Sequence, residues 1–234
     1  MAIDFQFETL AEDALLLRFG ERIDIRVNAE VTAAAACLQR ALPQLECVPA
    51  YASLLLRFDP MAWAGESVDP HQHLRDAVQE ALLTPMLDHA ATQEHLIPVC
   101  YGGTCGPDLE NVAKYVGLAP DIVISRHVAA DYCVGMIGFA PGFPYLLGLD
   151  PTLAVPRHSD PRQRVPAGSV AIGGEQTGVY PRELPGGWQL IGRTPLRLFD
   201  LSAASPSLLA AGDRVRFSVI DDEAFARLQA EQTR

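Results

Sequence analysis

Residues 168–194 read GSVAIGGEQTGVYPRELPGGWQLIGRT, and this stretch decides the fold of the carboxyl-terminal part. Three short strand-like runs, GSVAIGG, GVYP and WQLIGRT, are separated by glycine and proline turns. Further runs of this kind are YCVGMIGF, LRLFD and DRVRFSVI, and no long helix is expected before the terminal DEAFARLQAEQ. Because a barrel pairs the edges that an open sheet leaves exposed, many short strands favour a closed β-barrel.

The barrel region is expected to begin at LIPVCYGG (96–103), a strand that ends in paired glycines. Two short helices should follow, in GPDLENVAKYVG (106–117) and APDIVISRHVAA (119–130). Asp108 is expected to cap the first of these helices and Gly117 to end it. The carboxyl-terminal domain is therefore predicted as a β-barrel with helices near its start and end.

The first third of the chain alternates strands and helices. FQFETL and ALLLRF are predicted strands joined by AED, and VTAAAACLQRAL is a predicted helix that starts at Val31. YASLLLRF is a third strand, and PHQHLRDAVQEALLTPML is a second helix opened by Asp69 and Pro70. The order ββαβα predicts a small sheet covered by helices on one face. We therefore expect an α+β protein with domains at 1–90 and 91–234.

The 234-residue chain carries a formal net charge of −11, and Lys114 is its one lysine. A negative field repels phosphate backbones, which argues against a nucleic-acid partner. The amino terminus, MAIDFQFETL, has acids where a secretion signal has positive charge, and the apolar runs are shorter than the ~20 residues of a membrane helix. We therefore expect a cytoplasmic protein without a membrane partner.

Five cysteines are scattered along the chain, which favours reduced and mostly buried thiols. Cys100 and Cys105 are candidate metal ligands, but neither a Cys-x-x-Cys spacing nor a nearby histidine supports them. His71 and His73 flank one glutamine at an expected helix start, which spreads their side chains apart. The sequence therefore predicts no metal site.

Two clusters rich in glycine, proline and aromatic residues, GFAPGFPYL (138–146) and PGGWQLIGRTP (185–195), predict shaped loops. Proline fixes its own φ and glycine allows positive φ, so neither helix nor strand runs undisturbed there. Shaped loops often hold a ligand. The alternative is that Phe139 and Phe143 fill the barrel, and both interpretations remain open.

Arginines near these loops are candidates for binding an anion. Arg157, Arg162 and Arg164 lie within eight residues, either to grip a carboxylate or phosphoryl group or to form surface ion pairs. Arg193 ends a predicted strand, where it either stabilises negative charge or forms a salt bridge. His127, near a helix end, is a cap, a core residue or a proton carrier.

Gln176, Thr177 and Tyr180 offer an amide, a hydroxyl and a phenol that suit the orientation of a polar substrate. The chain lacks the phosphate-binding loop, the dinucleotide fingerprint, the G-x-S-x-G elbow and the H-E-x-x-H zinc motif. The residues alone thus indicate a two-domain protein with an anion-binding pocket.

Five longer segments together resemble one family. They are CYGGTCGPDLENVA, RHVAADYCVGMIGFAPGFPYLLGLDP, PRHSDPRQRVPAGSVAIGGEQTGVYP, LPGGWQLIGRTPLRLFD and GDRVRF. In this order they resemble the family of the B-type subunit of 5-oxoprolinase, also called allophanate hydrolase subunit 1, which includes the sporulation-kinase inhibitor. The resemblance is dense over residues 90–220 and looser before them.

The resemblance implies a ferredoxin-like α/β amino-terminal domain and a cyclophilin-like β-barrel carboxyl-terminal domain. It also implies a hetero-oligomer with the A-type subunit of the enzyme, and with its larger, carboxyltransferase-type C subunit. Together these proteins open 5-oxoproline to glutamate at the expense of ATP, and the chain alone is expected to be inactive. Phosphorylation of the lactam oxygen would supply a leaving group, and arginines and a Mg²⁺ site in the complex would serve this step.

Carried onto this sequence, the motifs predict that 138–145 and 185–193 form adjoining walls of one pocket. The predicted catalytic residues are His127, Arg162 and Arg193. The predicted substrate-binding residues are Phe139, Pro141, Gly142, Phe143, Tyr145, Gln176, Thr177, Tyr180, Gly186, Gly187 and Trp188.

Three other functions remain open at this point. The family includes a regulator that inhibits a sensor histidine kinase, and one fold can carry both roles. The second is a role within a related carboxyltransferase or allophanate hydrolase complex, with another cyclic amide or urea-like substrate. Prolyl isomerase activity, by analogy with the cyclophilin-like barrel, is the third.

Overall fold

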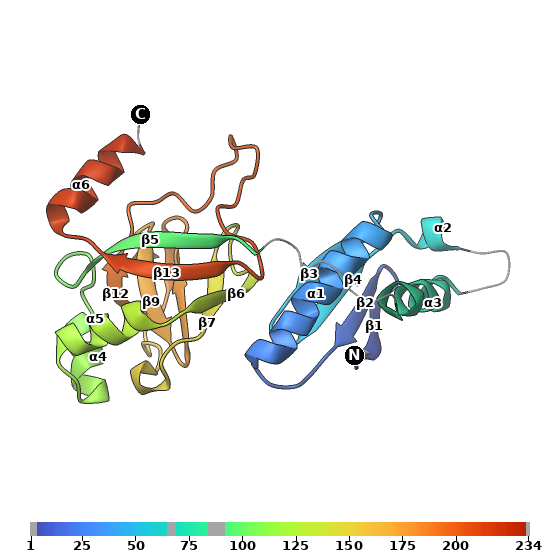
Figure 1. Cartoon of the computed structure of the whole chain (residues 1–234), viewed down its shortest axis with the longest axis horizontal. Helices are drawn as coiled ribbons and strands as arrows, with labels where there is room; N and C mark the ends of the chain where they lie inside the picture. Colours follow the sequence, from blue (N-terminus) through green and yellow to red (C-terminus); the bar gives the residue numbers. More distant parts are fainter. Residues whose placement is uncertain (1–3, 65–68, 84–91, 233–234) are drawn as a thin grey trace. The chain divides into compact units, whose positions relative to one another are not determined.

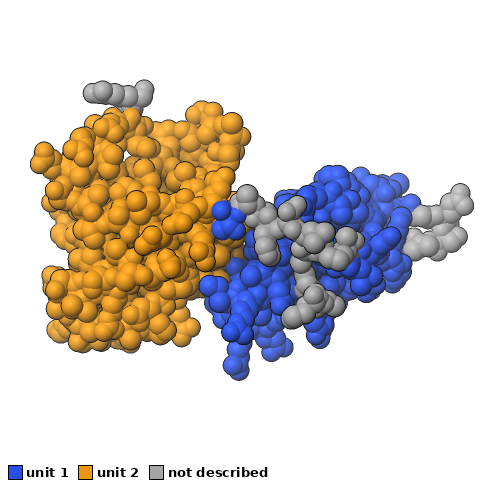
Figure 2. All heavy atoms as spheres, in the orientation of Figure 1, with its two compact units in different colours: residues 1–92 blue, residues 93–234 orange. Residues whose placement is uncertain are grey.

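The computed structural model describes residues 4–64, 69–83 and 92–232 (Figure 1). The chain divides into two compact units, Met1–Thr92 and Gln93–Arg234, coloured blue and orange in Figure 2. Each unit has its own hydrophobic core.

Unit 1 is a four-stranded antiparallel sheet in the order β1-β2-β4-β3. Its strands are β1 (Gln6–Ala11), β2 (Ala14–Arg18), β3 (Glu46–Pro49) and β4 (Ser53–Arg57), and its helices are α1 (Ile25–Ala41), α2 (Pro60–Trp63) and α3 (Pro70–Leu83). Leu15 pairs with Leu56 and Leu17 with Leu54, and all four are buried. Because strand side chains alternate between faces, these leucines form one apolar surface against the helices.

The predicted strands and helices of unit 1 are confirmed, with two differences. Helix α1 begins at Ile25 rather than Val31, because the Asp24 carboxylate accepts from the backbone N–H groups of Arg26 and Val27. The short strand β3 and the short helix α2 were not predicted, so the order is ββαββαα instead of ββαβα. The predicted extension of α3 beyond Leu83 lies outside the described residues.

Unit 2 is a closed barrel of seven strands in the order β10-β7-β6-β13-β5-β12-β9. These are β5 (Glu94–Tyr101), β6 (Tyr132–Ile137), β7 (Pro144–Leu147), β9 (Ser169–Gly173), β10 (Gln176–Val179), β12 (Gln189–Arg193) and β13 (Arg214–Val219). Strand β13 closes the barrel by pairing in parallel with β5, from Arg214 opposite Glu94 to Val219 opposite Val99. The α+β class and the predicted barrel are therefore confirmed.

Short elements surround the barrel. They are α4 (Leu109–Val116), α5 (Pro120–Ala129), α6 (Asp222–Glu231), the 3₁₀ turn η1 (Pro151–Leu153), and a two-stranded sheet of β8 (Arg162–Val165) with β11 (Leu184–Gly186). Helices α4 and α5 follow β5, and α6 follows β13 (Figure 1). Among the described residues, no helix has the length and apolar character needed to cross a membrane.

Three local predictions in unit 2 had different outcomes. Gly117 ends α4 with φ of 69°, as predicted. Asp108 is the N-cap residue of α4, as predicted, but its side chain makes no capping hydrogen bond and binds other groups instead. The predicted strand LRLFD is also wrong, since its residues form only a single bridge from Phe199 to Ser207.

Candidate functional site

A pocket of about 260 Å³ lies on unit 2, where the two predicted loops meet. Its lining residues are Phe139, Phe143, Tyr145, Arg157, His158, Pro161, Tyr180, Pro185, Gly186, Gly187 and Trp188. Seven of them were predicted to bind substrate, so the structure brings these seven to one place.

Aromatic rings packed edge to face form the wall of the pocket. Phe143 lies at the centre, with its ring 5.2 Å from Tyr180, 5.7 Å from Trp188 and 4.9 Å from Tyr145, measured between centroids. Phe143, Tyr180 and Trp188 are buried, which fixes the shape of the wall. Phe139 adds an exposed ring 5.5 Å from Phe143.

The backbone around this wall adopts conformations that the sequence has to permit. A Cβ on Gly186 would lie 2.2 Å from the Tyr180 hydroxyl, so only glycine fits there. The loop that carries Phe139 and Phe143 is closed by hydrogen bonds from Gly138 N to Phe143 O and from Phe143 N to Ala140 O. Phe139 has φ of 66°, which is costly for an aromatic residue and frequent at ligand sites.

Arg157 supplies positive charge at the pocket. Its guanidinium lies over the Trp188 ring, 5.4 Å from the centroid, and no acid of the described residues forms an ion pair with it. Burial raises the pKa of Tyr145 and of Tyr180, and the charge of Arg157 opposes that rise at both. Arg157 is therefore free to pair with an anionic ligand.

His158 is held by a buried carboxylate behind the pocket. Asp108 accepts from Arg162 Nη2 at 2.7 Å, from Leu190 N at 2.7 Å and from His158 Nε2 at 3.3 Å. Burial raises the pKa of Asp108, but the hydrogen bonds from Arg162, Leu190 and His158 outweigh it and lower the pKa below its ordinary value. A carboxylate that fixes one nitrogen of a histidine leaves the other available for acid–base chemistry.

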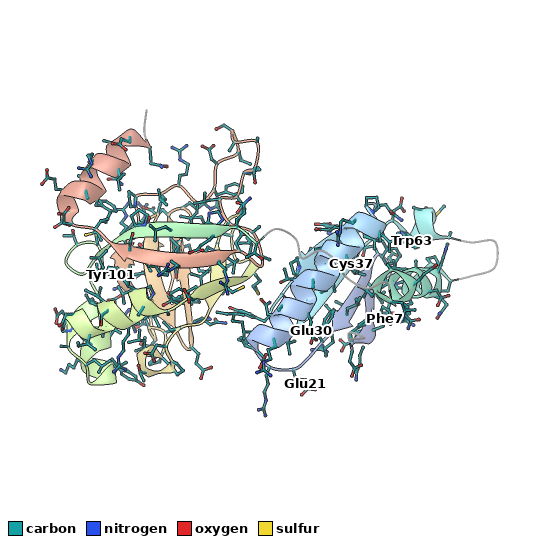
Figure 3. All side chains as sticks on the ribbon, in the orientation of Figure 1. Phe7, Glu21, Glu30, Cys37, Trp63 and Tyr101 are labelled. Carbon is teal, nitrogen blue, oxygen red and sulfur yellow. The ribbon has the colours of Figure 1, made fainter. Side chains whose placement is uncertain are left out.

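His127 and Thr177 lie in the barrel interior, not in the pocket lining. Thr177 Oγ1 donates to Ala171 O and therefore accepts from His127 Nε2, while the Tyr101 hydroxyl, 2.8 Å away, donates to Nδ1 (Tyr101 is labelled in Figure 3). Complete burial lowers the pKa of His127 to about 3. A proton-carrying role for His127 stays a prediction, and the contacts describe a neutral, fully bonded core residue.

The remaining predicted residues lie outside the lining. Arg193 donates from Nε to Ala167 O and lies over the Phe225 ring. Arg162 lies behind the pocket on Asp108, Gln176 begins β10, and Pro141 and Gly142 form the turn before Phe143. The structure thus separates Arg193, Gln176 and Thr177 from the aromatic wall.

Sequence reasoning missed His158, Asp108 and Pro161 as parts of the site, whereas Pro185 lies in the wall predicted at 185–193. His158 lies within PRHSDPRQR, so the arginine cluster was a signal that could have pointed to it. Asp108 offered no such signal, because an aspartate before a helix is ordinarily a cap. Arg157 was predicted only as one member of the cluster.

Comparisons with known proteins agree on a single family. The sequence profile described as "Carboxyltransferase domain, subdomain C and D" matches residues 5–209. The B-type subunit of the Bacillus subtilis (strain 168) 5-oxoprolinase is 43% identical over 99% of both chains. Its counterpart from Escherichia coli O157:H7 is 56% identical over 121 residues, 52% of this chain and 56% of that protein.

The chain belongs to the family of 5-oxoprolinase B-type subunits. Among solved structures, TTHA0988 superimposes with a TM-score of 0.76 at 38% identity, covering 89% of this chain and 40% of that longer one. PH0987 of Pyrococcus horikoshii is 41% identical, with a TM-score of 0.56 over 94% of this chain and all of that one. The K. lactis urea amidolyase, at 18% identity and a TM-score of 0.70, shares the fold, and this chain covers 16% of it.

Proposed function

We propose that the chain is the B-type subunit of an ATP-dependent 5-oxoprolinase, which opens 5-oxoproline to glutamate together with its A-type and C-type partners. The observation that carries this proposal is the 43% identity with a 5-oxoprolinase B-type subunit along 99% of both chains. The substrate site we propose is the pocket formed by Phe143, Tyr180, Trp188, Arg157 and His158.

The chemistry of this pocket suits a small cyclic amide with a carboxylate. The carboxylate of 5-oxoproline would pair with Arg157, which lacks an acidic partner among the described residues. The nearly flat five-membered ring would lie against the faces and edges of Tyr180 and Trp188. Both contacts would fix which side of the ring faces His158.

His158 is the group we propose for proton transfer. Opening the lactam breaks its C–N bond, adds the oxygen of water to the carbonyl carbon and leaves a proton on the nitrogen. With Nε2 directed at Asp108, the Nδ1 atom of His158 would accept a proton from water and return it to the leaving nitrogen. Arg162, bound to the same carboxylate, would position this pair.

The pocket does not fit ATP. Its volume of about 260 Å³ is below the ~300–1,000 Å³ of sites for drug-sized ligands, and Arg157 is one charge against several phosphates. We therefore propose that ATP, with Mg²⁺, is bound elsewhere in the complex. ATP supplies activation of the lactam, and this chain supplies the binding and orientation of the substrate.

The fold of each unit is consistent with this assignment. Without the short helix α2, unit 1 has the order ββαββα, and moving β1 to its end gives βαββαβ, so we infer a circularly permuted ferredoxin-like domain. The seven-stranded barrel of unit 2 suits the cyclophilin-like class.

The test of the proposal is ATP hydrolysis by the three co-expressed proteins, with and without 5-oxoproline. We expect 5-oxoproline to stimulate hydrolysis, glutamate to form, and both to disappear when this chain is omitted. An intact complex without stimulation would refute 5-oxoproline as the substrate, and proteins that do not associate would refute the role within a complex.

Replacing Arg157 should weaken substrate binding. In Arg157→Gln, loss of one charge-assisted hydrogen bond, worth ~1.5–3 kcal/mol, should raise KM for 5-oxoproline by ~10–100-fold while the complex still assembles. The matched control is Arg164→Gln, since Arg164 is exposed, lies 3.7 Å from Glu183 and does not line the pocket. Equal KM values for the two variants would contradict the role of Arg157.

A further inference from the structure

Two cysteines and an aspartate meet on the barrel away from the pocket. The ligand atoms of Cys100, Cys105 and Asp222 all lie within 4.8 Å of one another. Cys100 and Cys105 are buried, Asp222 is exposed, and the Cys100 thiol donates to Asp222 Oδ1 at 3.2 Å. None of the three lines the substrate pocket.

Rigid backbone holds both sulfurs. Cys100 lies on β5 opposite Arg193 of β12, so its position is fixed by the barrel. Cys105 precedes Gly106, where an added Cβ would lie 2.0 Å from Ile191 O, so this loop is pressed against β12. Hydrogen bonds from Gly102 N to Ile191 O and from Gly106 N to Gly102 O fix the loop further.

Asp222 reaches this place from the other end of the chain. Ile220, the first residue after β13, donates its backbone N–H to Val99 O, which holds this part of the chain beside β5. Asp221 then caps α6 by accepting from Ala224 N at 2.8 Å, and Asp222 is the first residue of the helix. The first residue of α6 therefore lies close to Cys100 and Cys105, so that three possible ligand atoms are brought together.

The surroundings of the Cys100 thiol disfavour its thiolate form while no metal is bound. Burial, together with the neighbouring Asp222 and Cys105, raises the pKa of this thiol to about 12. A divalent metal reverses this effect, because it binds thiolates and displaces their protons.

We propose that Cys100, Cys105 and Asp222 bind a zinc ion, with the fourth position open to water or an external ligand. Two thiolates favour a soft metal such as zinc over Mg²⁺ or Ca²⁺, and three protein ligands with one open position are typical of reactive rather than purely structural zinc sites. The ion would also fasten α6 to the barrel. Sequence spacing alone could not indicate this site, since Asp222 lies far from the cysteines in the chain.

The test is metal binding by the reduced, metal-free full chain, with zinc affinity from a chelator competition and Co²⁺ as a spectroscopic probe. We expect one ion per chain, a thiolate-to-cobalt charge-transfer band, and a higher Tm with zinc. Loss of an outer contact costs zinc sites ~10–100-fold in affinity, so Cys105→Ser should lose at least that much and most of the band. Asp222→Asn should bind more weakly but keep the band.

The matched control is Cys37→Ser, since Cys37 lies on α1 in unit 1 (Figure 3). It should bind zinc as the unaltered chain does. Circular dichroism checks that each variant folds. If Cys105→Ser does not fold, the zinc affinity of Asp222→Asn, at an exposed position, tests the proposal instead. Absence of the cobalt band in the unaltered chain, or equal losses in Cys37→Ser and Cys105→Ser, would overturn the proposal.

Discussion

The free energy of unfolding of unit 2 is expected to fall by ~2–3 kcal/mol between about pH 6.5 and pH 4.5 because of His127 alone. Burial lowers the pKa of His127 to about 3 in the folded protein, against 6.5 for a histidine in water. Below pH 6.5 the unfolded chain therefore binds a proton that the folded chain rejects. The contribution of neutral His127 to the free energy of unfolding is therefore fully present above pH 6.5. It is lost progressively as the pH falls toward 3.

The measurement is urea unfolding at the two pH values, followed by the fluorescence of Trp188 in a Trp63→Phe background. Trp63 lies in unit 1 and Trp188 in unit 2, so this background reports the barrel. In His127→Gln the side chain no longer titrates, and the extra loss between the two pH values should disappear. The variant should also be less stable at neutral pH, because one of two hydrogen bonds is lost.

Tyr101→Phe is the control for this experiment. It removes the donor to His127 Nδ1 but leaves the histidine buried, so it should cost ~1 kcal/mol and keep the pH dependence. If His127→Gln kept the full pH dependence, the proton would be taken up by another group.

Local sequence patterns predicted most of the strands and helices. The remaining features of the fold depend on contacts between segments that are distant in the sequence. Runs of consecutive leucines indicated β2 and β4, and turn residues indicated β6, β9, β10 and β12. The strand β7 was hidden inside GFAPGFPYL, since the prolines and glycines there indicate a loop. The segment LRLFD has a strand-like composition but pairs only at Phe199, and the barrel is closed by β13 and β5, which are distant in the sequence.

The site was predictable where the backbone demands particular residues. Gly186 is needed because Tyr180 lies against it, and this requirement is visible as a glycine beside aromatic residues in the sequence. The roles of charged side chains were not predictable in the same way. Arg162 and Arg193 resemble each other in sequence, but one binds a buried carboxylate and the other a carbonyl oxygen and an aromatic ring.

Replacing Asp108 should both destabilise the barrel and slow turnover. Asp108 N donates to Leu190 O at 2.9 Å, and its carboxylate accepts from Leu190 N at 2.7 Å, so one residue joins the start of α4 to β12. Asp108→Asn removes the charge that balances Arg162. Breaking a buried ion pair costs ~3–5 kcal/mol, and because Arg162 is partly exposed we expect ~2–4 kcal/mol, measured by urea unfolding.

The surface pair of Asp13 and Arg57 provides the control for stability. Both side chains are exposed, so Asp13→Asn should cost much less stability than Asp108→Asn. The double variant Asp108→Asn, Arg162→Gln should recover part of the loss, because no uncompensated charge remains. Equal costs for Asp13→Asn and Asp108→Asn would contradict the buried network.

The same variant separates the structural role of Asp108 from its role in positioning His158. Without the carboxylate, His158 loses the partner of Nε2, so kcat in the assembled complex should fall by ~10²–10⁴-fold if His158 carries the proton. Its pH–rate profile should also change, since the group that orients the histidine is gone. Arg162→Gln, which keeps the Asp108 carboxylate beside His158, should lose stability but retain more of kcat and the original profile. Identical profiles and equal losses of kcat in the two variants would mean that Asp108 acts only through the packing of α4 on β12.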